Sequence, residues 1–97
     1  MVKHIILWTL KDEFKTNEVK SGIKAGLENL KGKIDGLIDI KVIYGGLESS
    51  NADVMLDSTF EGEEALKNYA VHPAHQEVAN TKVRPFTATR SCLDFEI

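Results

Sequence analysis

Apolar side chains dominate the first part of the chain in a pattern typical of a buried β-strand. Residues 2–10 are mostly β-branched, aromatic or aliphatic and contain neither glycine nor proline. Alternation places His4, Ile6 and Trp8 on one face of this strand, and the opposite face is also largely apolar. The sequence therefore predicts a first strand that is covered on both sides.

A first helix is predicted to follow, from an N-cap at Thr16 to the glycines Gly32 and Gly36. Its apolar side chains recur at spacings of three and four residues, at Val19, Ile23, Leu27, Leu30 and Ile34. Threonine is a favourable N-cap, and glycine is common where helices end. We expect an amphipathic helix of about five turns.

Two further strands are predicted over residues 37–44 and 52–60. In the first, alternation gathers Ile38, Ile40, Val42 and Tyr44 on one face. In the second, Val54, Leu56 and Ser58 lie opposite Met55, Asp57 and Thr59. Glycine, serine and asparagine residues between the two segments favour a connecting turn.

Two helices and a last strand complete the pattern. Acidic residues within 61–64 open a helix that runs to about Val71, since negative charge is favourable in a first helical turn. Pro73 must break that helix, because proline disfavours a helical conformation in the residue before it. Proline also suits the first position of a helix, so a short third helix is predicted over 73–80. Residues 87–97 are expected to form the final strand.

The order of these elements is that of a ferredoxin-like α+β fold, a four-stranded antiparallel sheet with helices on one face. A chain of 97 residues has the length of one compact domain, so residues 1–97 are expected to form a single domain. Because the strands are apolar on both faces, the face without helices needs a cover. We expect a homodimer whose sheets pack together, a dimeric α/β barrel.

Composition and charge exclude several classes of protein. Apolar residues make up 42% and charged residues 28% of the chain, as in globular domains. The net charge of −3 argues against a nucleic-acid partner. No apolar run approaches the ~20 residues that cross a bilayer, and the N-terminus lacks a signal-peptide pattern. One cysteine excludes a disulfide framework, so we expect a soluble cytoplasmic protein without a membrane partner.

The densest cluster of functional side chains is the segment 69–75, Tyr-Ala-Val-His-Pro-Ala-His. Tyr69 is expected in the last turn of one helix and His75 in the first turn of the next. The dipole of that second helix disfavours a protonated imidazole, so His75 is expected to be neutral. A neutral histidine beside a phenol suits proton transfer α to a carbonyl group. The alternative is a purely structural role at a helix–helix corner.

The three histidines also raise the question of a metal site. His4 shares a strand face with apolar residues and needs a hydrogen-bond partner, which could be protein, water or ligand. No carboxylate or thiolate lies at a suitable spacing from the histidines, and Pro73 misaligns His72 with His75. We therefore predict no metal site. Cys92 has no base nearby in the sequence and is expected to be a buried, unreactive thiol.

The chain resembles the stress-responsive dimeric α/β-barrel (Dabb) family over essentially its whole length. The most specific part is Tyr69-x-x-His72-Pro73-x-His75, and the opening residues 2–7 and the segments 83–86 and 93–95 fit as well. Members of this family are described as ferredoxin-like chains that pair sheet to sheet into a dimeric barrel. The resemblance therefore implies the same fold and the same homodimer as the strand pattern.

The family's best understood enzyme type is a plant polyketide cyclase that makes olivetolic acid without metal or organic cofactor. It performs an intramolecular aldol condensation with a histidine and a tyrosine, which match His75 and Tyr69 here. His4 matches another polar residue of that pocket. This resemblance implies acid–base chemistry with no cofactor.

The same resemblance also shows departures from the cyclase pocket. A further pocket histidine of the cyclase falls near Val54 in this chain. The aromatic residues of its first helix are replaced around Gly22 and Gly26, and Trp8 is bulkier than its counterpart. We therefore do not predict a polyketide cyclase.

Together these patterns predict a homodimeric protein that binds or transforms a small, largely apolar molecule. In the enzyme hypothesis His75 is the base, Tyr69 donates a hydrogen bond to the developing enolate, and His4 orients the substrate. Substrate contacts are expected from Ile6, Trp8, Ile23 and His72. A non-catalytic stress-response or assembly protein and a cofactor-free monooxygenase remain alternatives. A cavity reaching His75 would favour ligand chemistry, whereas a corner filled by Trp8 would favour the structural role.

Overall fold

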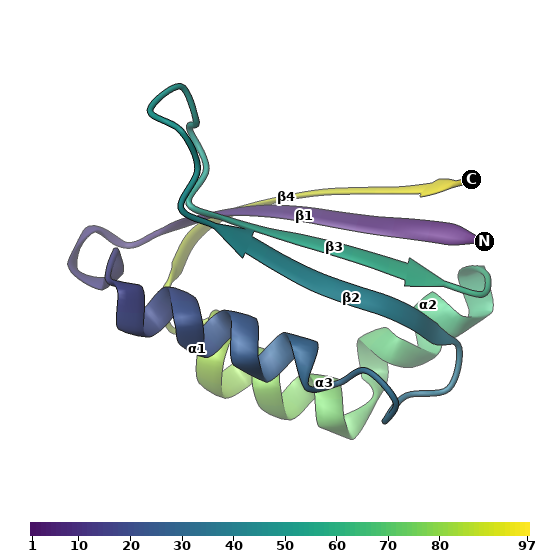
Figure 1. Cartoon of the computed structure of the whole chain (residues 1–97). Helices are drawn as coiled ribbons and strands as arrows, with labels where there is room; N and C mark the ends of the chain where they lie inside the picture. The colour runs from purple at the N-terminus through teal and green to yellow at the C-terminus, as the bar shows by residue number, and fades with distance from the viewer.

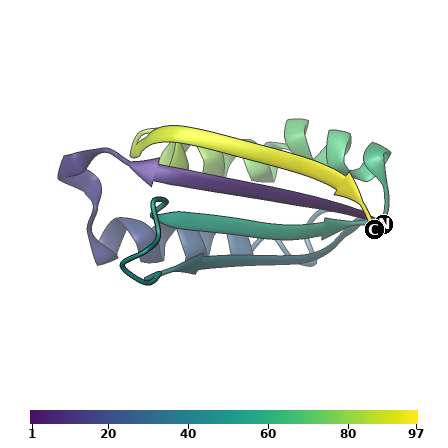
Figure 2. The same cartoon turned by 90° about the horizontal axis from the view of Figure 1, so that it is seen from above.

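One antiparallel sheet of four strands, in the order β2-β3-β1-β4, forms the frame of the computed structural model, which describes residues 1–97. The strands are β1 Val2–Leu10, β2 Leu37–Tyr44, β3 Val54–Phe60 and β4 Thr87–Glu96. The helices are α1 Asn17–Glu28, α2 Glu63–Val71 and α3 Pro73–Val78. All three helices cover the same face of the sheet (Figure 1), and the view from above shows no helix on the other face, toward which only the loop between β2 and β3 projects (Figure 2). This is the predicted ferredoxin-like α+β architecture.

The core lies between the helices and the two central strands. β1 and β3 bury every second side chain, and the helix-facing residues of β3 are Val54, Leu56, Ser58 and Phe60. In β1 the same face carries His4, Ile6 and Trp8, as the alternation predicted. Ile23 and Leu27 of α1 pack in this core from the helical side and are almost completely buried.

The first helix is shorter than its sequence pattern predicted, because α1 ends at Glu28. The chain continues in turns to Gly36, and Gly32 and Gly36 have φ values of +85° and +82°, which a continuing helix could not contain. Leu30 and Ile34 still reach the core from these turns. The periodicity therefore identified buried positions correctly and the helical conformation only in part.

A bulge near the start of β2 changes which of its residues are buried. The pairing with β3 shifts between Leu37 and Asp39, so the alternation reverses at this point. Leu37 and Ile40 face the core, whereas Ile38 is 41% exposed. The prediction that Ile38 shares a face with Ile40 is therefore wrong.

The sheet face away from the helices carries large apolar side chains without a cover, and we call it the open face. Its exposed members include Leu7, Ile43, Leu93 and Phe95. In the cross-strand pairing, Met55 lies between Leu7 and Ile43 at the centre of this face. An ion pair between Lys3 and Asp57 lies on the same side. The apolar character predicted for both faces of the sheet is present.

Candidate functional site

The junction of α2 and α3 brings Tyr69 and His75 together. His72 ends α2 and caps α3, and its Nδ1 accepts a hydrogen bond from the backbone N–H of Ala74 at 3.0 Å. Pro73 occupies the first position of α3, as predicted. This sharp corner leaves the ring centroids of Tyr69 and His75 4.2 Å apart.

The sheet contributes a third functional ring from β1. The centroid of His4 lies 6.2 Å from that of Tyr69. His4 pairs through Nδ1 with a carboxylate oxygen of Asp94, which lies directly opposite it in the antiparallel register of β1 and β4. Nδ1 of His4 therefore faces a carboxylate oxygen, to which an Nδ1–H would donate.

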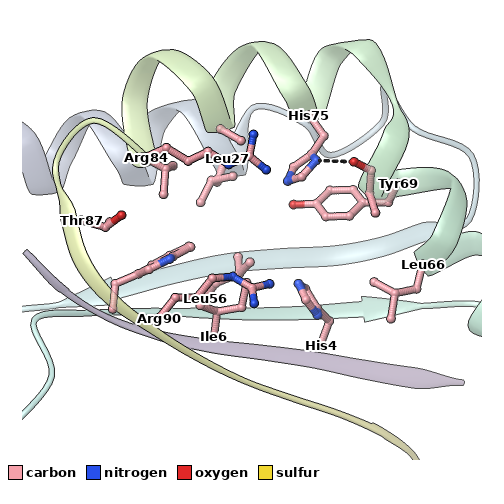
Figure 3. Close-up of a pocket in the computed structure, with 14 residues that line it drawn as sticks. His4, Ile6, Leu27, Leu56, Leu66, Tyr69, His75, Arg84, Thr87 and Arg90 are labelled. Atoms are coloured by element: carbon pink, nitrogen blue, oxygen red, sulfur yellow. Dashed lines mark hydrogen bonds between the residues drawn. The ribbon is translucent and has the colours of Figure 1, made fainter.

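A cavity of about 200 Å³ lies between these helical and sheet residues. Figure 3 shows His75 and Tyr69 above it and His4, Ile6 and Arg90 below it. The fourteen lining residues are His4, Ile6, Trp8, Leu27, Leu56, Leu66, Tyr69, Ala70, His75, Ala79, Val83, Arg84, Thr87 and Arg90. Trp8 and His75 both line this cavity, so the indole ring does not fill the corner beside His75.

Five of the seven predicted site residues line this cavity: His4, Ile6, Trp8, Tyr69 and His75. The two others, Ile23 and His72, do not line it. Ile23 is fully buried in the core beneath α1, and the ring of His72 is engaged in capping α3. The structure therefore does not bring these two predicted substrate contacts to the cavity, because Ile23 faces the core and the His72 ring binds the backbone.

Two arginines of the cavity were not among the predicted site residues. Arg84 follows a π-helical turn, Ala79–Val83, that continues from α3, and Arg90 lies on β4 opposite Trp8. Alternation within the last strand places Arg90 on the same face as Cys92, but nothing in the sequence pairs that face with His4 and Trp8. The pairing became evident only with the register of β1 and β4.

The Tyr69 hydroxyl is the most unusual polar group of the site. The Tyr69 side chain is 1% exposed, and its hydroxyl has no hydrogen-bond partner within the protein. Burial raises the pKa of this phenol well above its ordinary value, so it stays a protonated donor. Leaving a buried hydroxyl unpaired costs about 1–3 kcal/mol. A structural ring alone would be better served by phenylalanine, and this points to a partner that enters the cavity.

His75 has one nitrogen tied to the backbone and one free. Its Nδ1 lies 3.3 Å from the carbonyl oxygen of Ala70, to which an Nδ1–H would donate. Figure 3 shows this contact and the second ring nitrogen on the cavity side. Burial lowers the pKa of His75, the Ala70 contact opposes this, and the nearby charges of Arg84 and Arg90 lower it further. The lowered pKa agrees with the predicted neutral imidazole. Its main cause is burial, whereas the prediction rested on the dipole of α3.

The lowered pKa of His75 predicts a pH dependence of stability. His75 binds a proton more readily in the unfolded chain than in the folded protein. The neutral ring therefore contributes stability above about pH 6.5, and this contribution is lost as the pH falls toward the lowered pKa of the folded protein. Urea unfolding of the parent and of His75→Asn between pH 5 and 8 measures this contribution. We expect the stability difference between the two proteins to change with pH in that window. A constant difference would contradict a shifted His75.

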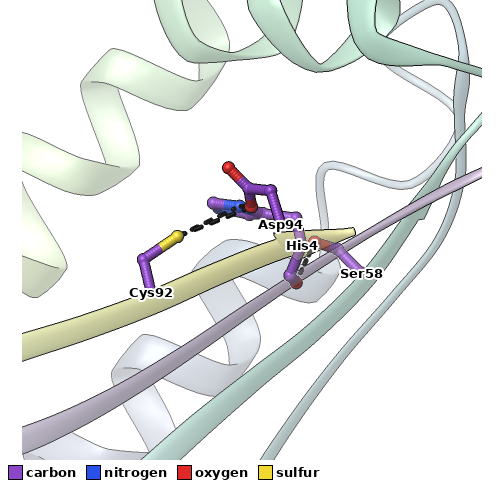
Figure 4. Close-up of polar contacts among 4 residues, drawn as sticks. All are labelled: His4, Ser58, Cys92 and Asp94. Carbon is purple, nitrogen blue, oxygen red and sulfur yellow. Dashed lines mark hydrogen bonds and ion pairs between the residues drawn. The ribbon is translucent and has the colours of Figure 1, made fainter. Parts of the chain in front are cut away.

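His4, Cys92 and Asp94 form a polar cluster (Figure 4), and its member His4 also lines the cavity. The Cys92 Sγ lies 3.7 Å from Nδ1 of His4 and 3.5 Å from Oδ1 of Asp94. One ligand atom from each residue fits within 4.8 Å, a donor set that could hold zinc. The expectation that no carboxylate or thiolate lies near the histidines is therefore wrong, because the β1–β4 register joins groups far apart in sequence.

The structure also corrects the prediction for Cys92, which is exposed. It lies on β4, an edge strand whose residues are nearly all exposed. Partial burial and the neighbouring Asp94 carboxylate raise the pKa of its thiol, which favours the protonated form.

Comparison with known proteins places the whole chain in a family. The profile of the stress-responsive A/B barrel domain matches residues 2–97. Stress-response A/B barrel domain-containing protein HS1 of Arabidopsis thaliana is 33% identical over 84 residues, which span 80% of this chain and 73% of that protein.

Solved structures share the whole architecture. A dimeric protein of unknown function with a ferredoxin-like fold from Bacteroides fragilis has a TM-score of 0.89 at 30% identity, covering 99% of this chain and 95% of that one. Hydroxynitrile lyase from Passiflora edulis has a TM-score of 0.83 at 19% identity, covering 99% and 92%. The second likeness is one of fold alone. None of the helices in this chain has the length and apolar composition needed to span a bilayer.

Proposed function

Because the chain belongs to the stress-responsive A/B barrel domain family, we propose that it forms a homodimer and that its Tyr69–His75 pocket transforms a small, largely apolar carbonyl compound. The observation that carries this proposal is the Tyr69 hydroxyl, which is buried at the cavity without a protein partner. An unpaired donor beside a neutral imidazole is suited to a ligand that brings an oxygen acceptor.

The proposed chemistry is proton abstraction from the carbon next to the carbonyl. The free Nε2 of His75 takes the proton, the C–H electron pair moves into the new C=C bond of the enolate, and negative charge develops on the carbonyl oxygen. The Tyr69 hydroxyl donates a hydrogen bond to that oxygen and stabilises it. His4, held by Asp94, orients the substrate from the opposite wall. These groups need no cofactor for this step.

A purely structural role of segment 69–75 is the alternative, and the contacts at the junction of α2 and α3 support it only in part. His72 has a backbone partner and explains the join between α2 and α3. Tyr69 has none for its hydroxyl, and one nitrogen of His75 is free of the backbone. A structural role therefore accounts for His72 and leaves the polar groups of its two neighbours unexplained. Only the general fold supports the monooxygenase alternative.

Hydrogen–deuterium exchange of phenylacetone in D₂O tests the proposed chemistry. This ketone carries an apolar ring and acidic protons next to its carbonyl, and proton NMR follows their loss. We expect the protein to accelerate exchange and His75→Asn and Tyr69→Phe each to reduce the catalysed rate about 100-fold, the usual scale for a lost acid–base group. His72→Asn keeps a capping side chain and serves as the control from the same corner.

Two results would overturn the proposal. One is exchange at the solvent rate in the presence of the parent protein. The other is catalysed exchange that His75→Asn and Tyr69→Phe leave unchanged, which would place the base elsewhere. Circular dichroism of each variant confirms that its fold is intact before rates are compared.

A further inference from the structure

We infer that the pocket selects small apolar molecules that carry a carboxylate, which Arg84 and Arg90 bind. This inference rests on the proposed function for the position of the reacting carbonyl, and it adds the class of substrate. The argument begins with the charge balance of the cavity wall. Its fourteen residues include two arginines and no aspartate or glutamate. The whole chain, in contrast, has fifteen acidic residues and twelve lysines and arginines.

Neither guanidinium is neutralised by the protein. Arg84 donates from Nη1 to the amide oxygens of Gln76 and Asn80, which carry no charge. Arg90 forms no ion pair, although Asp94 lies further along the same face of β4. The Asp94 carboxylate is engaged by His4 instead. Two cations therefore adjoin one small cavity without a counter-ion.

The two arginines approach the cavity from different walls. Arg84 comes from the helical side after α3, and Arg90 comes from the sheet, opposite Trp8 (Figure 3). Both charges act on His75, whose pKa they lower. The positive field therefore extends from the arginines to the proposed base.

The acidic groups nearest to this site lie outside the cavity. A wider groove of about 610 Å³ shares His4, Leu66, Ala70 and Arg90 with it. Glu63, Asp94 and Glu96 line that outer groove, together with Lys67. The inner cavity thus keeps its excess positive charge, and Arg90 lies where the two spaces join.

The lining suggests how such a ligand lies. Ile6, Trp8 and Leu56 offer apolar surface for its body, and the arginines offer planar donor groups that match a carboxylate. The carbonyl group would then lie near Tyr69 and His75. An apolar body, a carboxylate and a carbonyl group occur together in an apolar keto acid, here one small enough for a cavity of about 200 Å³.

Phenylpyruvate and its methyl ester form a matched pair that tests this inference. Both have the same apolar ring and the same ketone, and only the first has a carboxylate. Equilibrium binding is measured by isothermal titration calorimetry, with the parent protein, Arg84→Gln and Arg90→Gln. We expect the parent to bind phenylpyruvate at least about tenfold more tightly than the ester, the usual scale of a charge-assisted contact. Each arginine substitution should weaken phenylpyruvate binding about tenfold and leave ester binding unchanged.

The inference fails if the ester binds as tightly as the acid, or if both substitutions weaken the two ligands equally. It also fails if neither ligand binds at millimolar concentration. Arg90→Gln is the cleaner variant, because Arg84 also holds Gln76 and Asn80. Equilibrium binding does not depend on turnover, so carboxylate selectivity without catalysed exchange of either phenylacetone or phenylpyruvate would contradict only the proposed chemistry. Exchange of phenylacetone without selectivity would contradict only the inference.

Discussion

Replacing Leu7 with glutamate is expected to convert the proposed dimer into monomers. Leu7 lies on the open face and is 42% exposed in the single chain, with Met55 beside it in the cross-strand pairing. If two such faces pack together, the new carboxylate is buried without a partner. An unpaired charge in an apolar interface costs about 3 kcal/mol or more, which weakens the dimer at least about 100-fold.

Light scattering during size-exclusion chromatography measures this change. The parent should elute with twice the 10.8 kDa mass of one chain and Leu7→Glu with that mass itself. Val71→Glu is the matched control, because Val71 is 75% exposed at the end of α2, on the helix-covered side of the sheet, and should leave the dimer intact. A monomeric parent, or a Leu7→Glu protein that stays dimeric at low micromolar concentration, would refute the proposed packing. Circular dichroism confirms that each variant is folded.

Two substitutions of Tyr69 are expected to differ sharply in stability. Tyr69→Ala removes a ring that packs against Phe60, with centroids 4.9 Å apart, and should cost about 3–5 kcal/mol. A domain of this size has about 5–15 kcal/mol in total, so this variant should be close to unfolding. Tyr69→Phe keeps the ring and removes only the unpartnered hydroxyl. It should be as stable as the parent or more stable.

Urea unfolding at one fixed protein concentration measures both effects, since the stability of a dimer depends on concentration. The contrast separates a structural ring from a functional hydroxyl. A loss of 1–3 kcal/mol in Tyr69→Phe would mean that the hydroxyl satisfies a partner inside the folded protein. That result, combined with unaltered phenylacetone exchange, would support a structural corner.

Strand alternation and helix periodicity were sufficient to predict the order of elements and most buried positions. β1 and β3 bury every second residue, because a central strand exposes alternate side chains to the two faces of its sheet. Pro73 begins α3, because its ring fixes its own φ angle at a helical value independently of tertiary contacts. The bulge in β2 could not be predicted, since it arises from the pairing of Asp39 with β3.

The candidate site divides in the same way. The sequence by itself brought Tyr69 near His75, because both lie within seven residues around a helix-breaking proline, and it placed His4 beside Ile6 and Trp8 on one strand face. Only the tertiary structure joined Asp94 to His4, brought Arg84 and Arg90 to the cavity wall, and turned Ile23 and His72 away from it. Antiparallel register and helix packing determine such contacts. They depend on how distant segments fit together, whereas alternation and proline geometry act on neighbours along the chain.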